Sequence, residues 1–409
     1  MVSFDGGWTA FAGAEAVIEM HAAAGLDIRD VAAEAERHTR VRAGADHHPL
    51  TWHGGIAFDP AASSGRDLPA VSFVLPSVEV RAHGGRATLA VNIVDGPGAS
   101  RRRAAARAER RLEVALQRLA EALPPVRAPI AGRIRSQLPD RRAWMDSVED
   151  AKTLIAAGVL EKVVLARTLD IEADGPLDAV AVLGELIGQG TLSHPFLFEP
   201  RPGVAMVGAS PELLCRVNAG RFSATAVAGS AGRGHDALED VDLANGLLLS
   251  EKDRSEHELV VRDMSERLVR LGATPTVEPD PHLLRLKRIW HLETRLAAEL
   301  NGAGHVLEVL SALHPTPAVC GTPRSAARFA IAKLEPFDRG WYAGPIGWFD
   351  TDGNGAFVPA LRCARVHGRS ARLYAGAGIV AASDPAAEWE ETNVKLRPVL
   401  EALGLEAGP

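Results

Sequence analysis

The sequence lacks the features that mark membrane, secreted and nucleic-acid-binding proteins. Nowhere in its 409 residues do 18 apolar residues run together, and no basic segment followed by an apolar stretch opens the chain. We therefore expect neither a membrane-spanning helix nor a secretory leader. Basic residues are not in excess, because the formal net charge is −7. This balance argues against nucleic acid and anionic membranes as partners.

Cysteine is also scarce. Cys215, Cys320 and Cys363 are scattered without the spacing of a metal site or of a disulfide framework. This usage suits a reducing compartment, so we expect a cytoplasmic protein. The rest of the composition is ordinary for a globular chain, with 46% hydrophobic and 24% charged residues. The length allows one large or two ordinary domains with a substantial core.

The amino-terminal part of the chain changes from strands to a helix and then to a connection. Alternating apolar residues from Trp52 onward predict strands, two of which meet at a hairpin around His83-Gly84-Gly85. Residues 101–123 predict a helix whose arginines form a solvated face. Pro and Arg are frequent between Pro124 and Asp140. We therefore expect an amino-terminal portion at 1–123, a connection at 124–140 and the remainder at 141–409.

The carboxyl-terminal part predicts an antiparallel sheet. The segments GPIGWFD, AFVPALRCARV and ARLYAGAGIV are separated by Asp-Gly-Asn-Gly and His-Gly turns. This pattern predicts a meander of three strands.

The stretch Tyr374–Lys395 follows this meander and predicts a strand, a turn and a helix. Asp384 and Pro385 suit the N-cap and first helical position, so Glu388 and Glu391 share one helix face. We interpret this face as one wall of an active site. The local alternatives are a solvated face and an ion pair from Glu391 to Lys395 four residues on.

A second carboxylate pair with the same spacing lies far upstream. Asp253 and Glu256 belong to a helix predicted over 251–271. Two such helices facing each other would offer oxygen ligands of the kind that magnesium prefers. The alternative for Asp253 is a capping box with Ser250.

Two further residues are candidates for proton transfer. Lys162 opens an otherwise apolar strand, where it either extends to water or loses its hydration. Burial would favour its neutral amine, which can act as a general base. Glu212 follows Ser210-Pro211 before an apolar run, and low-dielectric surroundings there would raise its pKa and let it donate a proton. Alone, it would be a strand-end carboxylate. The glycines of AGSAGRG could present backbone N–H groups to a carboxylate, but no Lys-Ser or Lys-Thr follows, so this is not a P-loop.

Several motifs then occur together in a recognisable order. They are KVVLAR, GASPELL, AVAGSAGRG, SEKDRSEHELV, WHLET, HPTPAVCGTPR, GWYAGPIGW, ALRCARV and YAGAGIVAASDPAAEWEETNVK. The chain resembles the chorismate-utilising enzymes (anthranilate synthase component I-like), and most closely the isochorismate synthases, over roughly residues 144–403. The resemblance implies a single α+β chorismate-binding fold in which two large antiparallel sheets pack together with helices on the outside.

The resemblance also implies a role for each candidate. Chorismate would be the substrate and Mg2+ the cofactor, held by Glu256 and Glu391 with Asp253 and Glu388 beside them. Gly229 and Ser230 would bind the ring carboxylate through backbone amides. Arg362 and Tyr342 would bind the enolpyruvyl carboxylate near Gly376, and Lys395 would add a cation. His291 and Ala318 complete the implied substrate-binding set.

Within the family the residue types favour an isomerase that adds water. Lys162 would activate a water that attacks C2 of the ring, while Glu212 protonates the departing C4 hydroxyl. Ammonia-adding relatives usually carry Gln at the position of Lys162, and aminodeoxychorismate synthases carry Lys at the position of Ala228. We therefore expect no glutamine amidotransferase subunit, and a monomer. Salicylate synthases, which go on to expel pyruvate, and a binding scaffold without chemistry remain alternatives. The downstream pathway, to siderophores, menaquinone or salicylate-derived products, is left open.

Overall fold

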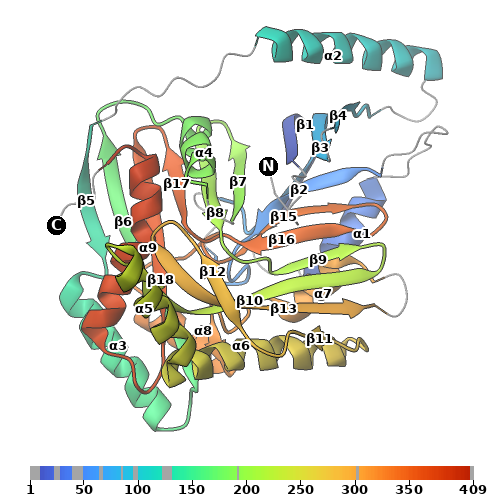
Figure 1. The fold of residues 1–409 in the computed structure, drawn as a ribbon. Helices are drawn as coiled ribbons and strands as arrows, with labels where there is room; N and C mark the ends of the chain where they lie inside the picture. The colour runs from blue at the N-terminus through green and yellow to red at the C-terminus, as the bar shows by residue number, and fades with distance from the viewer. Residues whose placement is uncertain are drawn as a thin grey trace.

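Two antiparallel sheets packed against each other form the body of the protein (Figure 1). The structure is a computed structural model. It describes residues 10–22, 28–38, 49–63, 68–83, 86–94, 100–121, 131–190, 193–300 and 304–405. Within these residues one sheet has eleven strands and the other seven, and every strand pair is antiparallel. The expected α+β class with two large sheets is confirmed.

The larger sheet joins the two ends of the sequence. Its strand order is β1-β3-β2-β15-β16-β9-β10-β13-β11, with β4 paired to β3 and β12 paired to β13. The amino-terminal strand β2 thus pairs directly with β15 from the carboxyl-terminal part of the chain. The strands are β1 (Ala10–Ala22), β2 (Thr51–Ile56), β3 (Val71–His83), β4 (Arg86–Val91), β9 (Cys215–Asn218), β10 (Arg221–Gly232), β11 (Thr276–Val277), β12 (His282–Arg285), β13 (Ile289–Glu299), β15 (Pro345–Asp350) and β16 (Gly355–Pro359).

The smaller sheet contains a long antiparallel pair, β6 with β18. Its order is β14-β6-β18-β17-β8-β7, with β5 paired to β6. The strands are β5 (Gly132–Leu138), β6 (Lys162–Ala173), β7 (His194–Arg201), β8 (Val204–Ser210), β14 (Gly321–Thr322), β17 (Cys363–His367) and β18 (Ser370–Ile379).

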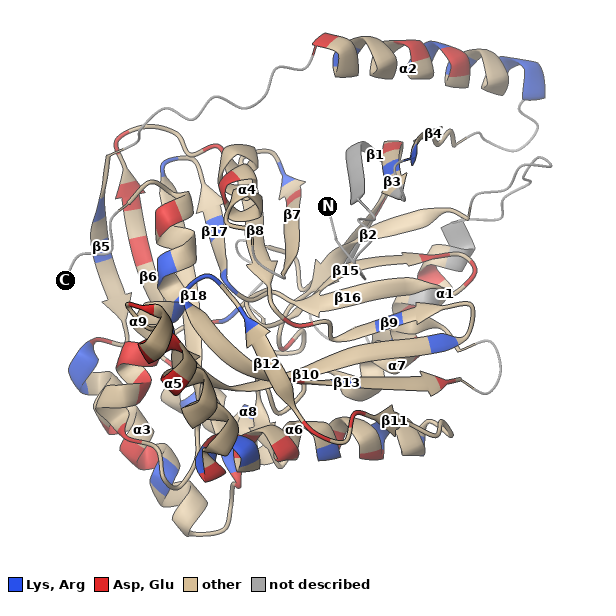
Figure 2. Cartoon of the chain, viewed as in Figure 1, with Lys and Arg blue, Asp and Glu red and all other residues tan. Residues whose placement is uncertain are grey.

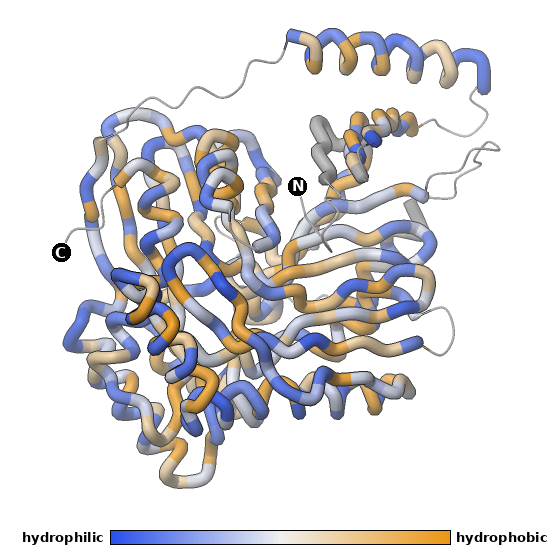
Figure 3. Tube along the Cα trace, in the orientation of Figure 1, coloured by the Kyte–Doolittle hydropathy of each residue, from blue (hydrophilic) through white to orange (hydrophobic). Residues whose placement is uncertain are grey.

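Several helices cover the outer faces of the sheets, whereas α2 lies off these faces at the top of the view, and many charged residues lie on helices (Figures 1 and 2). Helix α6 packs on β10 of the larger sheet and α9 packs on β18 of the smaller one. Figure 3 shows that the sheet strands carry many of the hydrophobic residues, as buried strands require. The helices are α1 (Ile28–His38), α2 (Arg101–Glu121), α3 (Arg141–Ala156), α4 (Ala179–Gly188), α5 (Ala237–Leu249), α6 (Glu251–Arg270), α7 (Val306–Leu313), α8 (Arg324–Leu334) and α9 (Pro385–Ala402).

The core lies between the two sheets. Leu165 of β6 and Val358 of β16 come from different sheets and belong to one buried hydrophobic cluster. Phe58, from the amino-terminal portion, belongs to the same cluster. The division at 1–123, 124–140 and 141–409 therefore separates segments of sequence that share one core. Part of the expected connection, 124–130, and the turn at Gly84-Gly85 lie outside the described residues.

The predicted carboxyl-terminal meander is wrong in one respect. The segment AFVPALRCARV was predicted to be a single strand, but it forms β16 in the larger sheet and β17 in the smaller one. The chain crosses between the sheets at 360–362, where Arg362 has a φ of 47°. Because the segment is apolar on both sides of the crossing, its periodicity does not reveal the break. The crossing brings Arg362 to the junction of the sheets.

Candidate active site

A cavity at the junction of the sheets collects most of the predicted site residues. It lies where the ends of β10, β13 and β18 approach α6 and α9. Of the residues named from the sequence, those that line it are Glu212, Gly229, Ser230, Glu256, His291, Ala318, Tyr342, Arg362, Gly376, Glu391 and Lys395. Asp253 and Glu388 line an adjoining cavity that shares Ser230 and Glu391 with the first.

Lys162 is completely buried beside this cavity. Its side chain is 0% exposed, so of the two alternatives the loss of hydration is the one that the structure shows. The Nζ atom lies 2.9 Å from Oε1 of Glu256, an ion pair without hydrogen-bond geometry. Thr322 of β14 pairs with Lys162 and covers the start of β6. A Cβ on Gly378 would meet Glu256 Oε1 at 2.2 Å and Lys162 Cε at 2.9 Å, so a side chain there would displace both members of the pair.

Glu212 is buried on another wall of the same cavity. It is 1% exposed, and within the described residues its Oε1 has no hydrogen-bond partner. Burial raises the pKa of Glu212 to about 8, while Lys162 opposes the shift and Glu293 adds to it. The carboxyl group is therefore largely protonated at neutral pH, as a proton donor must be.

A bulge in β10 shapes the expected carboxylate-binding backbone. The register between β10 and β13 shifts between Ala228 and Ser230. Gly229 occupies the bulge with a φ of 78°, which glycine adopts without strain. A Cβ there would also approach the Cβ of Asp253 at 3.0 Å. The bulge at Ala228-Gly229-Ser230 thus brings the backbone of β10 close to Asp253, near the start of α6.

His291 and Arg362 form a fixed pair on the cavity wall. His291 Nδ1 lies 3.0 Å from the carbonyl oxygen of Gly229 and Nε2 lies 2.9 Å from Nη2 of Arg362. A carbonyl only accepts and a guanidinium only donates, so Nδ1 carries the proton and Nε2 accepts. Burial, followed by the charges of Arg362 and Lys395, holds the pKa of His291 well below its usual value. The neutral imidazole therefore orients the guanidinium.

The remaining polar groups around the cavity come from α9 and from the loop before β15. Lys395 pairs with Glu391 and donates to the carbonyl of Gly376 over 2.9 Å. The ring of Tyr342 stacks on Tyr374 with centroids 5.0 Å apart. A Cβ on Gly376 would meet the Tyr342 hydroxyl at 2.9 Å, so this glycine permits the close approach.

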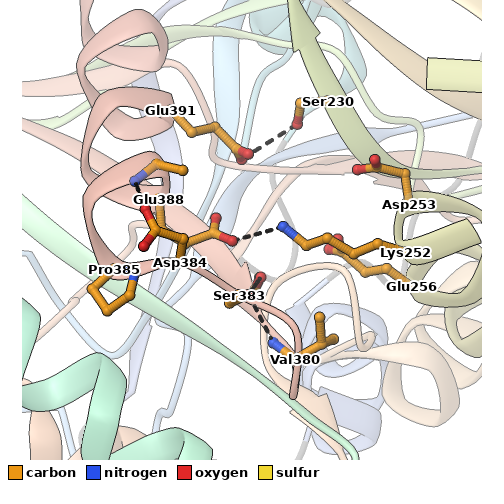
Figure 4. Close-up of polar contacts among 12 residues, drawn as sticks. Ser230, Lys252, Asp253, Glu256, Val380, Ser383, Asp384, Pro385, Glu388 and Glu391 are labelled. Atoms are coloured by element: carbon orange, nitrogen blue, oxygen red, sulfur yellow. Dashed lines mark hydrogen bonds and ion pairs between the residues drawn. The ribbon is translucent and has the colours of Figure 1, made fainter. Parts of the chain in front are cut away.

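The four predicted metal-binding carboxylates come from the first two turns of α6 and α9, which face each other (Figure 4). Asp384 caps α9 by accepting from the amide of Ala387 over 2.8 Å, as its sequence predicts. Glu388 in the first turn is buried, so the solvated alternative is wrong for it. Ser230 donates to Glu391 over 3.3 Å. These side chains meet only because two distant helices converge.

The local alternatives hold only in part beside this arrangement. Ser250 caps α6 by accepting from the amide of Asp253 over 3.2 Å, and its hydroxyl donates to the Asp253 carboxylate. The Ser250 amide donates to the carbonyl of Leu247 instead, so the reciprocal bond of a capping box is not formed. Lys395 and Glu391 form the expected pair within α9. Among the residues that the structure describes, no three or more His, Cys, Asp or Glu side chains are grouped closely enough to hold a metal ion.

Lysines hold these carboxylates in the structure. Lys162 pairs with Glu256, Lys395 pairs with Glu391, and Lys252 Nζ lies 2.8 Å from Oε1 of Glu388 (Figure 4). Sequence reasoning missed Lys252, although it directly precedes Asp253 in the motif. Burial alone would raise the pKa of Glu391, but Lys395 with Lys252 and Arg362 outweighs it and the pKa is lowered. The pKa of Glu388 is raised by burial and by the neighbouring Glu391.

A family model described as chorismate binding enzyme matches residues 5–404. The chain belongs to the chorismate-binding enzymes. Among curated relatives, this chorismate-binding enzyme is 42% identical to the isochorismate synthase EntC of Escherichia coli strain K12 over 271 residues. The aligned region covers 66% of this chain and 69% of EntC. It is 44% identical over 270 residues to a salicylate biosynthesis isochorismate synthase of Pseudomonas aeruginosa, covering 66% of this chain and 56% of the relative.

Solved structures share the whole fold of this chorismate-binding enzyme. The menaquinone-specific isochorismate synthase MenF of Escherichia coli superposes with a TM-score of 0.81 at 31% identity, over 96% of this chain and 85% of MenF. Anthranilate synthase component I of Streptococcus pneumoniae gives a TM-score of 0.78 at 20% identity, over 96% and 92% of the two chains, which shows the fold alone. The resemblance read from the motifs is confirmed.

Proposed function

We propose that this chain is an isochorismate synthase, which converts chorismate to isochorismate by adding water at C2 and expelling the C4 hydroxyl. One observation carries the chemistry. Lys162 Nζ and Glu212 Oε1 are both buried beside one cavity. Within the described residues Glu212 Oε1 has no hydrogen-bond partner, and Lys162 Nζ has the ion pair with Glu256 but no hydrogen bond. Buried polar atoms without partners are rare and expensive, and they are expected where a substrate supplies the missing partners.

The two residues divide the proton transfers. In its neutral form, the amine of Lys162 takes a proton from water as the water oxygen bonds to C2. The ring double bonds shift, and the C4–oxygen bond breaks as Glu212 gives its proton to the leaving hydroxyl. One water enters and one water leaves, so the reaction is an isomerisation. Protonation of Glu212 at neutral pH, which burial maintains, suits this role.

The other residues would hold a dianionic substrate. Arg362, which contacts His291 and lines the cavity, would bind the enolpyruvyl carboxylate together with Tyr342. The backbone at Gly229 and Ser230 would bind the ring carboxylate. Lys395 would supply a further cation on the same cavity, and Ala318 and Gly376, which also line it, would leave room for the ring.

We also propose Mg2+ as the cofactor. The donor chemistry fits, because Glu256, Glu391, Asp253 and Glu388 provide only oxygen ligands and line two adjoining cavities, although the four would have to draw closer together around an ion. When bound there, the ion would supply positive charge for the ring carboxylate. Because water is the proposed nucleophile, we propose no ammonia-supplying subunit and a monomer as the working unit. The described cysteines are all free and buried, which supports a reducing cytoplasm. In the described part of the chain, no helix has the length and apolar character needed to cross a membrane.

Product analysis tests the proposal. The purified protein is incubated with chorismate and Mg2+, and the products are separated by chromatography beside a reaction with EDTA. We expect isochorismate with Mg2+ and none with EDTA. Salicylate together with stoichiometric pyruvate would replace the proposal by a salicylate synthase. Unchanged chorismate under both conditions would leave only a binding scaffold.

A further inference from the structure

Three lysines occupy the carboxylate cluster, and one of them has no part in the proposed reaction. Lys162 is assigned to proton transfer and Lys395 to substrate binding. Lys252, the second residue of α6, is assigned to neither, although it pairs with Glu388 over 2.8 Å. The proposed reaction therefore does not account for the pair between Lys252 and Glu388.

The surroundings of Lys252 match those proposed for the metal. Glu388 reaches its ammonium from α9, and Glu256 and Asp253 attract it from its own helix, Glu256 being four residues on. Lys252 lines the adjoining cavity together with Asp253, Glu388 and Glu391 (Figure 4). The Lys252 ammonium thus pairs with Glu388 and lies near other carboxylates that a divalent cation would use.

Exposure separates Lys252 from the other two lysines. Its side chain is 34% exposed, compared with 12% for Lys395 and 0% for Lys162. The Lys252 ammonium can therefore leave Glu388 and regain its hydration in the solvent, whereas Lys162 cannot. Glu388 stays behind, because its own side chain is only 3% exposed.

We propose that Lys252 is a built-in competitor for the metal, whose ammonium holds Glu388 until a divalent cation displaces it. The lysine keeps the buried carboxylate paired in the metal-free enzyme, since an unpaired buried charge is costly. It also lowers the affinity for the metal, because the incoming cation must break the ion pair between Lys252 and Glu388 before Glu388 can bind it. This inference rests on the proposed metal site, and it makes Lys252 a positioning residue that acts through Glu388.

Direct metal binding without chorismate tests the role. Mg2+ affinity is measured by calorimetry and Mn2+ affinity by electron paramagnetic resonance, on folded protein checked by circular dichroism. Lys252→Met keeps the apolar stem and removes the charge. We expect it to bind both ions roughly ten-fold more tightly than the wild type. The matched control is Lys287→Met, which breaks the exposed pair of Lys287 with Glu401 away from the cluster and should leave affinity unchanged.

A double-mutant cycle separates displacement from a general charge effect. In the Glu388→Gln background the ion pair is already lost, so Lys252→Met should change metal affinity by less than about two-fold. Equal or weaker binding by Lys252→Met overturns the inference, because the lysine would then merely support the site. An equal gain in both backgrounds also overturns displacement from Glu388. If the wild type binds neither ion, the metal site in the proposed function fails as well.

Discussion

At the scale of single residues, the proposed proton donor is held in an environment that opposes its ionisation. The pKa of Glu212 is about 8 in the folded chain, against an ordinary value of 4.5. Between these values the folded state keeps a proton that the unfolded chain releases. The favourable contribution of neutral Glu212 is complete below pH 4.5 and is lost as the pH rises through about 8.

Glu212→Gln removes this dependence while keeping the shape of the side chain. We expect the variant to gain roughly 2–4 kcal/mol of unfolding free energy over the wild type at about pH 8.5, and much less at about pH 5. Urea denaturation of both proteins at the two pH values measures the difference. An equal gain at both values would show that the carboxyl group is not held neutral by burial.

Lys162 is the residue whose loss should affect turnover most directly. Removing a general base lowers rates by about 10²–10⁴-fold, so Lys162→Ala should lose at least a hundred-fold in kcat with chorismate. Lys333→Ala, at an exposed position of α8, is the control and should retain full activity. Circular dichroism checks that both variants fold. Full turnover by Lys162→Ala would remove the lysine from the mechanism.

At the scale of elements, the N-cap of α9 supports both the helix and the proposed metal site. Asp384 accepts from the Ala387 amide, and Glu388 lies in the same first turn. We expect Asp384→Ala to lose about 1 kcal/mol of unfolding free energy and to need more Mg2+ for half-maximal activity. The matched control is Asp178→Ala, because Asp178 caps α4 in the same way.

The control separates stability from site geometry. Both variants should lose similar stability in denaturant titrations, but only Asp384→Ala should shift the Mg2+ requirement. A shift of equal size in Asp178→Ala would mean that general destabilisation, and not the position of Glu388, decides the affinity.

At the scale of the whole molecule, one buried ion pair joins segments that are far apart in the sequence. Arg339 Nε donates to Glu335 over 2.8 Å, and its other nitrogens donate to the carbonyls of Val164 and Val319. Glu335 accepts from the amide of Ala166 over 2.8 Å. The pair therefore ties β6, which begins with the proposed base, to α8 and to the loop before β14.

Breaking this pair should cost far more than breaking an exposed one. Arg339→Met leaves the buried Glu335 without its partner, and we expect a loss of about 3–5 kcal/mol of unfolding free energy. Arg270→Met breaks the exposed Arg270–Glu266 pair of α6 and should change stability by less than about 1 kcal/mol. Denaturant titration of the two variants measures both values, and similar small losses would show that the buried pair is not a structural tie.

Much of the local structure was predictable from the sequence because its causes are local. Asp384-Pro385 predicts the start of α9, and the apolar runs predict β6 and β18. The crossing at 360–362 was not predictable, since apolar residues on both sides suit a strand in either sheet. The crowding at Gly378 was not predictable, because the atoms that a Cβ there would meet belong to Glu256 and Lys162.

By itself the sequence determined the types of element, the helix caps and the residues able to carry the chemistry. Only the tertiary structure decided which charged groups lose their water and which partner each receives. Lys162 and Glu212 are buried by segments distant in the chain, and Lys252 meets Glu388 across 136 positions. The physical reason is that caps and periodicity depend on neighbours within a few residues, whereas desolvation and ion pairing depend on whatever packs nearby in space.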